Sequence, residues 1–75
     1  MNTSITFQDF KTMSHHQRYK SIRLHGTYLM SRDKEEQCVM LFQLNDFYVE
    51  AYIEKSSGKA NLLRCFKNSY ELYPY

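Results

Sequence analysis

The spacing of hydrophobic and polar residues changes its period near Thr27. Before that point, apolar residues recur at helical intervals, which is typical of short amphipathic helices. After it, four segments alternate with a period of two and predict strands: TYLMSR, QCVMLFQL, FYVEAYIE and ANLLRCFK. The breaks between them, DKEE, Asn45-Asp46 and KSSGK, are short and rich in turn-forming residues. Connections of this length leave no room for crossovers, so we expect an antiparallel meander.

The first part of the chain predicts two helical pieces. Residues 1–13 are expected to form a loose helical turn that Thr6 caps and that places two phenylalanines on one side. Ser14 begins a longer helix over residues 14–26, because the S-x-x-Q sequence at its start completes a capping box. Gly26 is expected to end this helix in the left-handed conformation.

The central hairpin has a well-specified register. With a two-residue turn at Asn45-Asp46, all the paired residues on one face are apolar, and a slip by one residue would break that match. The expected pairs are Leu44 with Phe47, Phe42 with Val49, Met40 with Ala51, and Cys38 with Ile53.

The two outer strands are less constrained. A tight turn at Ser57-Gly58 predicts the pairs Ile53–Leu62, Ala51–Arg64 and Val49–Phe66 on the core face. An edge position would let the Arg64 guanidinium reach solvent along its stem. For the first strand, the pattern leaves two alternatives open: Leu29 faces the core, or Tyr28 and Met30 do.

Together these elements predict one small α+β domain over residues 1–75. An N-terminal helical segment precedes a four-stranded antiparallel β-meander over residues 27–67, and the helix packs on one face of the sheet. An aromatic tail at residues 68–75 is expected to pack against the domain. The expected core consists of Phe7 or Phe10, Tyr19, Ile22, Met40, Phe42, Leu44, Phe47, Val49, Ala51, Ile53, Leu62 and Phe66.

The other face of the sheet mixes tyrosines, carboxylates and aliphatic residues. A contiguous apolar surface of this kind marks an interaction site, and one helix cannot cover both faces of a sheet. The tail, a second copy or a different partner is needed to cover it. We expect a homodimer, because twofold dimers are the commonest assembly. The expected contact residues are Val39, Leu41, Tyr48, Glu50, Tyr52 and Leu63.

The net charge is +2 over 75 residues, but the basic excess is local. Residues 1–26 hold four basic residues and one acidic residue, giving +3, whereas the rest holds six and seven, giving −1. The second helix carries a basic stripe of His16, Lys20 and Arg23. A solvated helix face is its simpler interpretation. The alternative function is weak RNA or DNA binding by this stripe with Arg64 and Lys67, for which bacterial RNA-cleaving toxins offer a fold-level analogy.

No arrangement in the sequence predicts catalysis, a cofactor or a metal site. Glu50 and Glu54 lie roughly 13 Å apart along one strand face, which is too far to share one glycosidic bond. The three histidines and two cysteines lack the spacings of metal ligands. Two glycines do not suffice for a phosphate-binding loop. We therefore expect a non-enzymatic protein-interaction module.

The sequence also bears on location. No window approaches the ~18 apolar residues of a membrane span, and the N-terminus lacks the basic and apolar regions of a signal peptide. Cys38 and Cys65 lie outside any CxxC motif and are expected to be free thiols. These features predict a cytoplasmic protein without a membrane partner.

Overall fold

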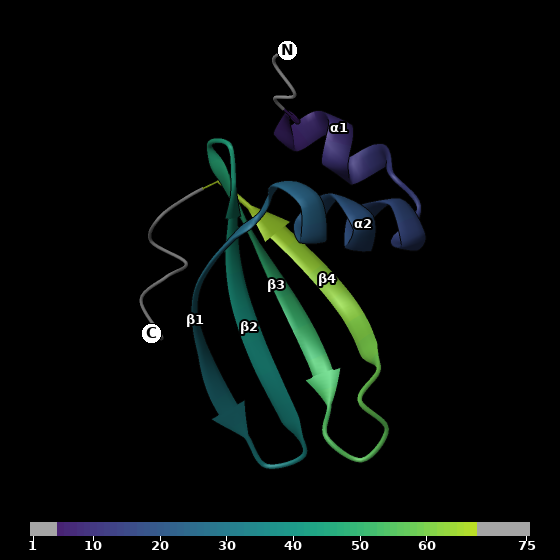
Figure 1. The fold of residues 1–75 in the computed structure, drawn as a ribbon, viewed down its shortest axis with the longest axis vertical. Coiled ribbons are helices and arrows are strands. Elements are labelled where there is room, and N and C mark those ends of the chain that lie inside the picture. Colours follow the sequence, from purple (N-terminus) through teal and green to yellow (C-terminus); the bar gives the residue numbers. More distant parts are fainter. Residues whose placement is uncertain (1–4, 68–75) are drawn as a thin grey trace.

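The chain folds into a four-stranded antiparallel sheet with two short helices near one end (Figure 1). The structure, a computed structural model, describes residues 5–67 and, at residues 61–63, the backbone alone. The elements are α1 (Phe7–Thr12), α2 (His15–His25), β1 (Thr27–Lys34), β2 (Gln37–Leu44), β3 (Phe47–Glu54) and β4 (Ala60–Phe66). The strands lie side by side in chain order, which confirms the predicted α+β architecture. The predicted aromatic tail lies outside the described residues.

Both helices begin with a capping box. In α1, the Thr6 hydroxyl accepts from the Asp9 amide at 3.0 Å, and the Asp9 carboxylate accepts from the Thr6 amide at 3.2 Å. Ser14 and Gln17 make the same reciprocal pair at the start of α2, as the sequence predicts. Each box satisfies two backbone donors that a helix start leaves without partners.

Arg18 fixes the angle between the two helices. Its Nε donates to the carbonyl of Phe10 at 3.1 Å, and its Nη2 donates to the carbonyl of Lys11 at 3.0 Å. The guanidinium also lies 5.3 Å from the centre of the Phe10 ring. One side chain of α2 thus donates to two carbonyls in the last turn of α1, of which that of Phe10 also accepts from the Met13 amide at 3.2 Å.

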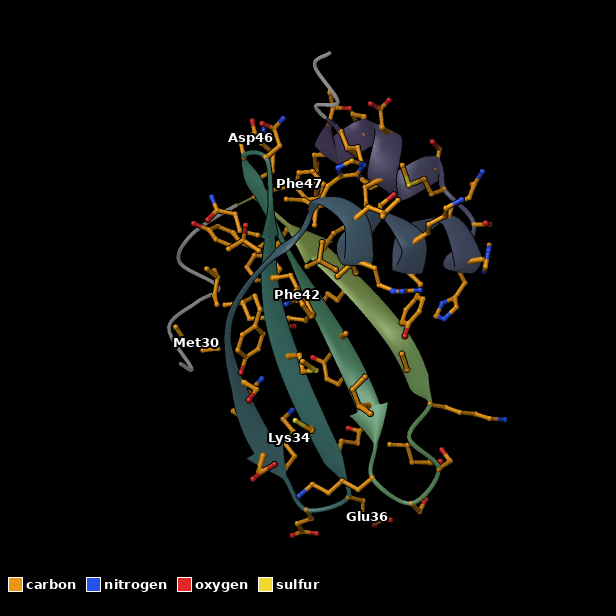
Figure 2. All side chains as sticks on the ribbon, viewed as in Figure 1. Met30, Lys34, Glu36, Phe42, Asp46 and Phe47 are labelled. Atoms are coloured by element: carbon orange, nitrogen blue, oxygen red, sulfur yellow. The ribbon has the colours of Figure 1, made fainter. Side chains whose placement is uncertain are left out.

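The core lies between the helices and one face of the sheet, which we call the helix side. Phe10 of α1 and Ile22 of α2 pack against Leu44, Phe47, Val49 and Ala51 of the central hairpin. Phe47 is fully buried, and its ring centre lies 5.5 Å from that of Phe10 and 5.7 Å from that of Phe7. Figure 2 shows Phe47 at the end of the sheet nearest α1. This aromatic cluster joins α1 to the hairpin.

The central hairpin has the predicted register. Leu44 pairs with Phe47, Phe42 with Val49, Met40 with Ala51, and Cys38 with Ile53. Asn45 adopts a left-handed φ of 52° in the turn, a conformation that asparagine tolerates better than most residues.

The predicted register of β4 is wrong by one residue. Val49 pairs with Cys65, Ala51 with Leu63, and Glu50 with Arg64. A bulge between Tyr52 and Ile53 and a longer connection, in which Gly58 adopts a φ of 74°, replace the expected tight turn. Because side chains alternate between faces, Arg64 and Phe66 move from the predicted core face to the second face of the sheet.

A bulge also decides the orientation of β1. The register shifts between Tyr28 and Met30, so that Tyr28 pairs with Phe42 on the helix side and Met30 pairs with Leu41 on the second face. The extra residue is Leu29. The alternative that places both Tyr28 and Met30 on the core face is therefore correct for Tyr28 and wrong for Met30, because it assumes an uninterrupted alternation.

Two further predictions about α2 are wrong. Tyr19 is 48 % exposed and is not part of the core. Gly26 has an extended backbone, with φ −81° and ψ 147°, so it does not need a left-handed conformation. Space explains this glycine instead, since a Cβ would lie 2.7 Å from the carbonyl oxygen of Ile22 and 3.0 Å from Leu44 Cδ1.

Candidate functional site

The structure places five of the six predicted contact residues in different environments. Val39 and Leu41 are fully buried, and Glu50 is almost so, whereas Tyr48 and Tyr52 are half-buried. Val39 and Leu41 therefore have no surface to offer a partner in this conformation. The backbone of Leu63 pairs with that of Ala51, and its side chain lies outside the described part of the structure.

Glu50 is the centre of an ionic cluster on the second face. Its Oε1 accepts from Arg64 Nη1 at 3.0 Å and from the Tyr52 hydroxyl at 3.1 Å. Its Oε2 lies 4.0 Å from Nη2 of Arg32. The carboxylate side chain is 3 % exposed, whereas those of Arg32 and Arg64 are 30 % and 44 % exposed. Residues of β1, β3 and β4 thus meet around one buried negative charge.

Aromatic side chains contact the two hydrogen-bond partners of Glu50 or belong to them: Phe66 lies beside Arg64 with Tyr48 stacked on it, and Tyr52 is itself a partner. The Arg64 guanidinium lies 4.9 Å from the centre of the Phe66 ring, which stacks on Tyr48. Burial and the neighbouring Glu50 carboxylate raise the pKa of Tyr52 above its usual value, against the smaller opposing effects of the arginines. The Tyr52 phenol therefore stays protonated at neutral pH and can donate to Glu50.

The chemistry of this cluster is structural. A general acid or base must reach a substrate atom, but the Glu50 carboxylate is buried and already accepts hydrogen bonds from two side chains. We interpret the cluster as a stabilising ionic link between β1, β3 and β4.

The five residues of the predicted basic site divide into two groups. His16, Lys20 and Arg23 are exposed on α2. Arg64 belongs to the Glu50 cluster, and Lys67 lies 3.7 Å from Asp46 at the far end of the central hairpin. Arg64 and Lys67 are also exposed, but each pairs with a carboxylate, so the helix stripe carries the basic character of this site.

Two hollows lie beneath α2 on the helix side, and we call them together the α2 trough. One, of about 300 Å³, is lined by Tyr19, Ile22, Arg23, Gly26, Tyr28, Met40, Phe42, Ala51 and Ile53. The other, of about 410 Å³, is lined by His15, His16, Tyr19, Ile53, Gly58, Lys59 and Ala60. They share Tyr19 and Ile53. The trough exists because the helices cover only one end of the sheet (Figure 1).

Sequence reasoning missed both Arg32 and the trough. Arg32 pairs with Val39 on the second face, beyond a bulge in β1 that the residue pattern does not reveal. The sequence predicts Tyr19, Met40 and Ile53 as core residues, because helical spacing or strand alternation places them on the same side as other apolar residues. The exposed side of Tyr19 and the partial burial of Met40 and Ile53 depend on how far α2 extends over the sheet.

The remaining candidates give no site. Within residues 5–67, no three histidine, cysteine, aspartate or glutamate side chains are grouped as a metal site requires. Cys38 and Cys65 are free and partly buried. No helix in the described segment is long and apolar enough to cross a membrane. Comparisons with protein-family models, curated proteins and solved structures gave no match to this chain.

Proposed function

We propose that the chain is a non-enzymatic interaction module that forms a homodimer through the outer edge of β1. The observation that carries this proposal is the exposure of that strand. β1 lies at one edge of the sheet, and seven of its eight residues are exposed. Three of them, Tyr28, Leu29 and Met30, are large and apolar. Figure 2 shows Met30 at the outer border of the sheet. An edge strand of this kind presents backbone groups and apolar side chains to another strand.

A second copy suits this edge because the strand is compatible with itself. Antiparallel pairing about a twofold axis through Ser31 sets Met30 opposite Arg32 of the copy. With Leu29 left out of the pairing as the bulge residue, it also sets Tyr28 opposite Asp33 and Thr27 opposite Lys34. No like charges then face each other, which would destabilise the pairing. The product is a continuous sheet with the two halves related by the commonest symmetry of oligomers.

This interface differs from the one that the sequence indicates. The second face supplies Tyr48, Glu50 and Tyr52, but the aliphatic residues between them are buried. The edge of β1 offers exposed apolar groups without any rearrangement, so it is the better support for self-association.

Leu29→Lys is expected to weaken the dimer at least about tenfold, because it replaces an exposed apolar residue of the edge strand with a charge, and charges on an edge oppose pairing with another strand. Sedimentation velocity over a range of concentrations measures the change. Gln8→Lys is the matched control, since it adds the same charge at an exposed position of α1. A wild-type monomer at high micromolar concentration would contradict self-association. Dissociation by Tyr52→Glu, with no effect of Leu29→Lys, would move the interface to the second face.

Weak nucleic-acid binding is the second candidate, and the exposure of the α2 stripe favours it. His16, Lys20 and Arg23 all lie on the surface of a helix that contains no acidic residue. A stripe of two cations and one histidine contacts few phosphates, so the affinity should be low and dependent on salt. The tyrosines of the second face add little, because they are half-buried and neighbour Glu50.

The double variant Lys20→Gln/Arg23→Gln is expected to abolish binding of mixed-sequence RNA and DNA at low salt. Fluorescence anisotropy with labelled oligonucleotides measures it, and Lys67→Gln controls for the loss of a charge elsewhere. An absence of wild-type binding at low salt removes this candidate. Equal binding by the double variant and the wild type assigns the contact to other residues and likewise rejects the stripe.

A further inference from the structure

The α2 trough has an apolar floor. Met40 and Phe42 of β2 and Ala51 and Ile53 of β3 form it on the helix side of the sheet. Phe10 and Ile22 fill the space above the other end of the same face. At the trough, by contrast, Met40, Phe42 and Ile53 remain only partly buried. Partly wet apolar surface in a concave site is what favours binding of an apolar group.

The border of the trough is basic. Arg23 lines the hollow of about 300 Å³, and His15, His16 and Lys59 line the adjoining one. None of the described residues that line either hollow is acidic. An apolar cavity with cations at its border has the charge and polarity pattern of a site for an amphipathic anion.

The size of the smaller hollow limits the ligand. Small-molecule sites usually begin near 300 Å³, and this hollow has about 300 Å³. The hollow is therefore large enough for one medium-length acyl chain or one ring system, and it is too small for a lipid with two chains. Tyr19 and Tyr28 flank the floor and add ring surface to the walls.

We propose that the α2 trough binds a free medium-chain fatty acid, with its chain on the floor between Phe42 and Ile53 and its carboxylate on Arg23. The guanidinium can hold a carboxylate through two parallel hydrogen bonds, which fixes the orientation of the chain. This site lies on the helix side of the sheet, whereas the proposed dimer contact is the outer edge of β1; Tyr28 borders both. It requires no contribution from a second copy.

Dodecanoate, used below its micelle concentration, is expected to bind with a stoichiometry of one per chain in isothermal titration calorimetry. Arg23→Gln should weaken this binding about tenfold, because it removes one charge-assisted pair. Lys20→Gln is the matched control: it removes the same charge from the same helix, but Lys20 lines a different hollow. Dodecyltrimethylammonium, with the same chain and the opposite charge, should bind much more weakly than dodecanoate.

Amide NMR spectra locate the ligand. Dodecanoate should shift the amides of Phe42, Ala51 and Ile53 more than those of exposed loop residues such as Glu35. An absence of saturable binding, or shifts confined to β1, would overturn the proposal. Equal affinity of Arg23→Gln and wild type, or equal affinity for the cationic probe, would overturn the assignment of the carboxylate. Leu29→Lys should bind dodecanoate normally, so failure of the dimer proposal and failure of this one are distinguishable.

Discussion

Phe47→Ala is expected to lower the free energy of unfolding by about 3–5 kcal/mol, the largest effect of any single substitution that we predict. The Phe47 side chain is fully buried and contacts the rings of Phe7 and Phe10, so its removal separates α1 from the hairpin. Small domains have total stabilities of about 5–15 kcal/mol. The variant should therefore be largely unfolded at moderate urea concentrations that leave the wild type folded, as followed by circular dichroism.

Two further variants, Tyr28→Ala and Phe47→Leu, serve as comparisons for Phe47→Ala. Tyr28→Ala also removes an aromatic side chain from the sheet, but Tyr28 is about half exposed, so its cost should be much smaller. Phe47→Leu keeps most of the volume and should cost less than Phe47→Ala, which gives a measurable intermediate if the alanine variant does not fold. Equal losses for Tyr28→Ala and Phe47→Ala would show that the aromatic cluster does not hold α1.

Glu50→Gln is expected to destabilise the chain by about 1–3 kcal/mol, because it leaves Arg32 and Arg64 without the charge between them. The partial exposure of both guanidinium groups keeps the cost below that of a fully buried pair. The amide also offers one acceptor where the carboxylate has two. Urea unfolding of the variant measures the difference.

Glu35→Gln is the matched control for Glu50. Glu35 lies exposed in the turn between β1 and β2, so the same substitution there should change the stability by less than about 0.5 kcal/mol. Equal stabilities of Glu35→Gln and Glu50→Gln would contradict the interpretation of the Glu50 cluster as a stabilising ionic link between strands.

The outer strands show why an accurate local pattern can still give a wrong register. β4 has the sequence ANLLRCF, in which apolar residues occupy both phases of the alternation. Leu62 and Leu63 are adjacent, as are Cys65 and Phe66, so either register supplies apolar residues to the core face. The bulge at Tyr52 selects one of them, and with it the pairing of Arg64 with Glu50.

Of the candidate sites, one could also be predicted from local spacing and the other depends on the tertiary structure. The basic stripe of α2 could be predicted because helical spacing alone places His16, Lys20 and Arg23 on one side. The trough could not, because it depends on the length of α2 relative to the sheet and on the position of the shared wall residue Tyr19. The burial of Val39 and Leu41 likewise follows from the assembled chain and not from their spacing.

The sequence by itself determined the helix starts, the central hairpin and the α+β order of elements. Each of these rests on residues close together in the chain: two capping boxes, one turn, and one clean alternation. The tertiary structure alone decided the two bulges, the ionic cluster at Glu50 and the open trough beneath α2. These depend on contacts between distant segments, whose packing selects among arrangements that local patterns leave equally favourable.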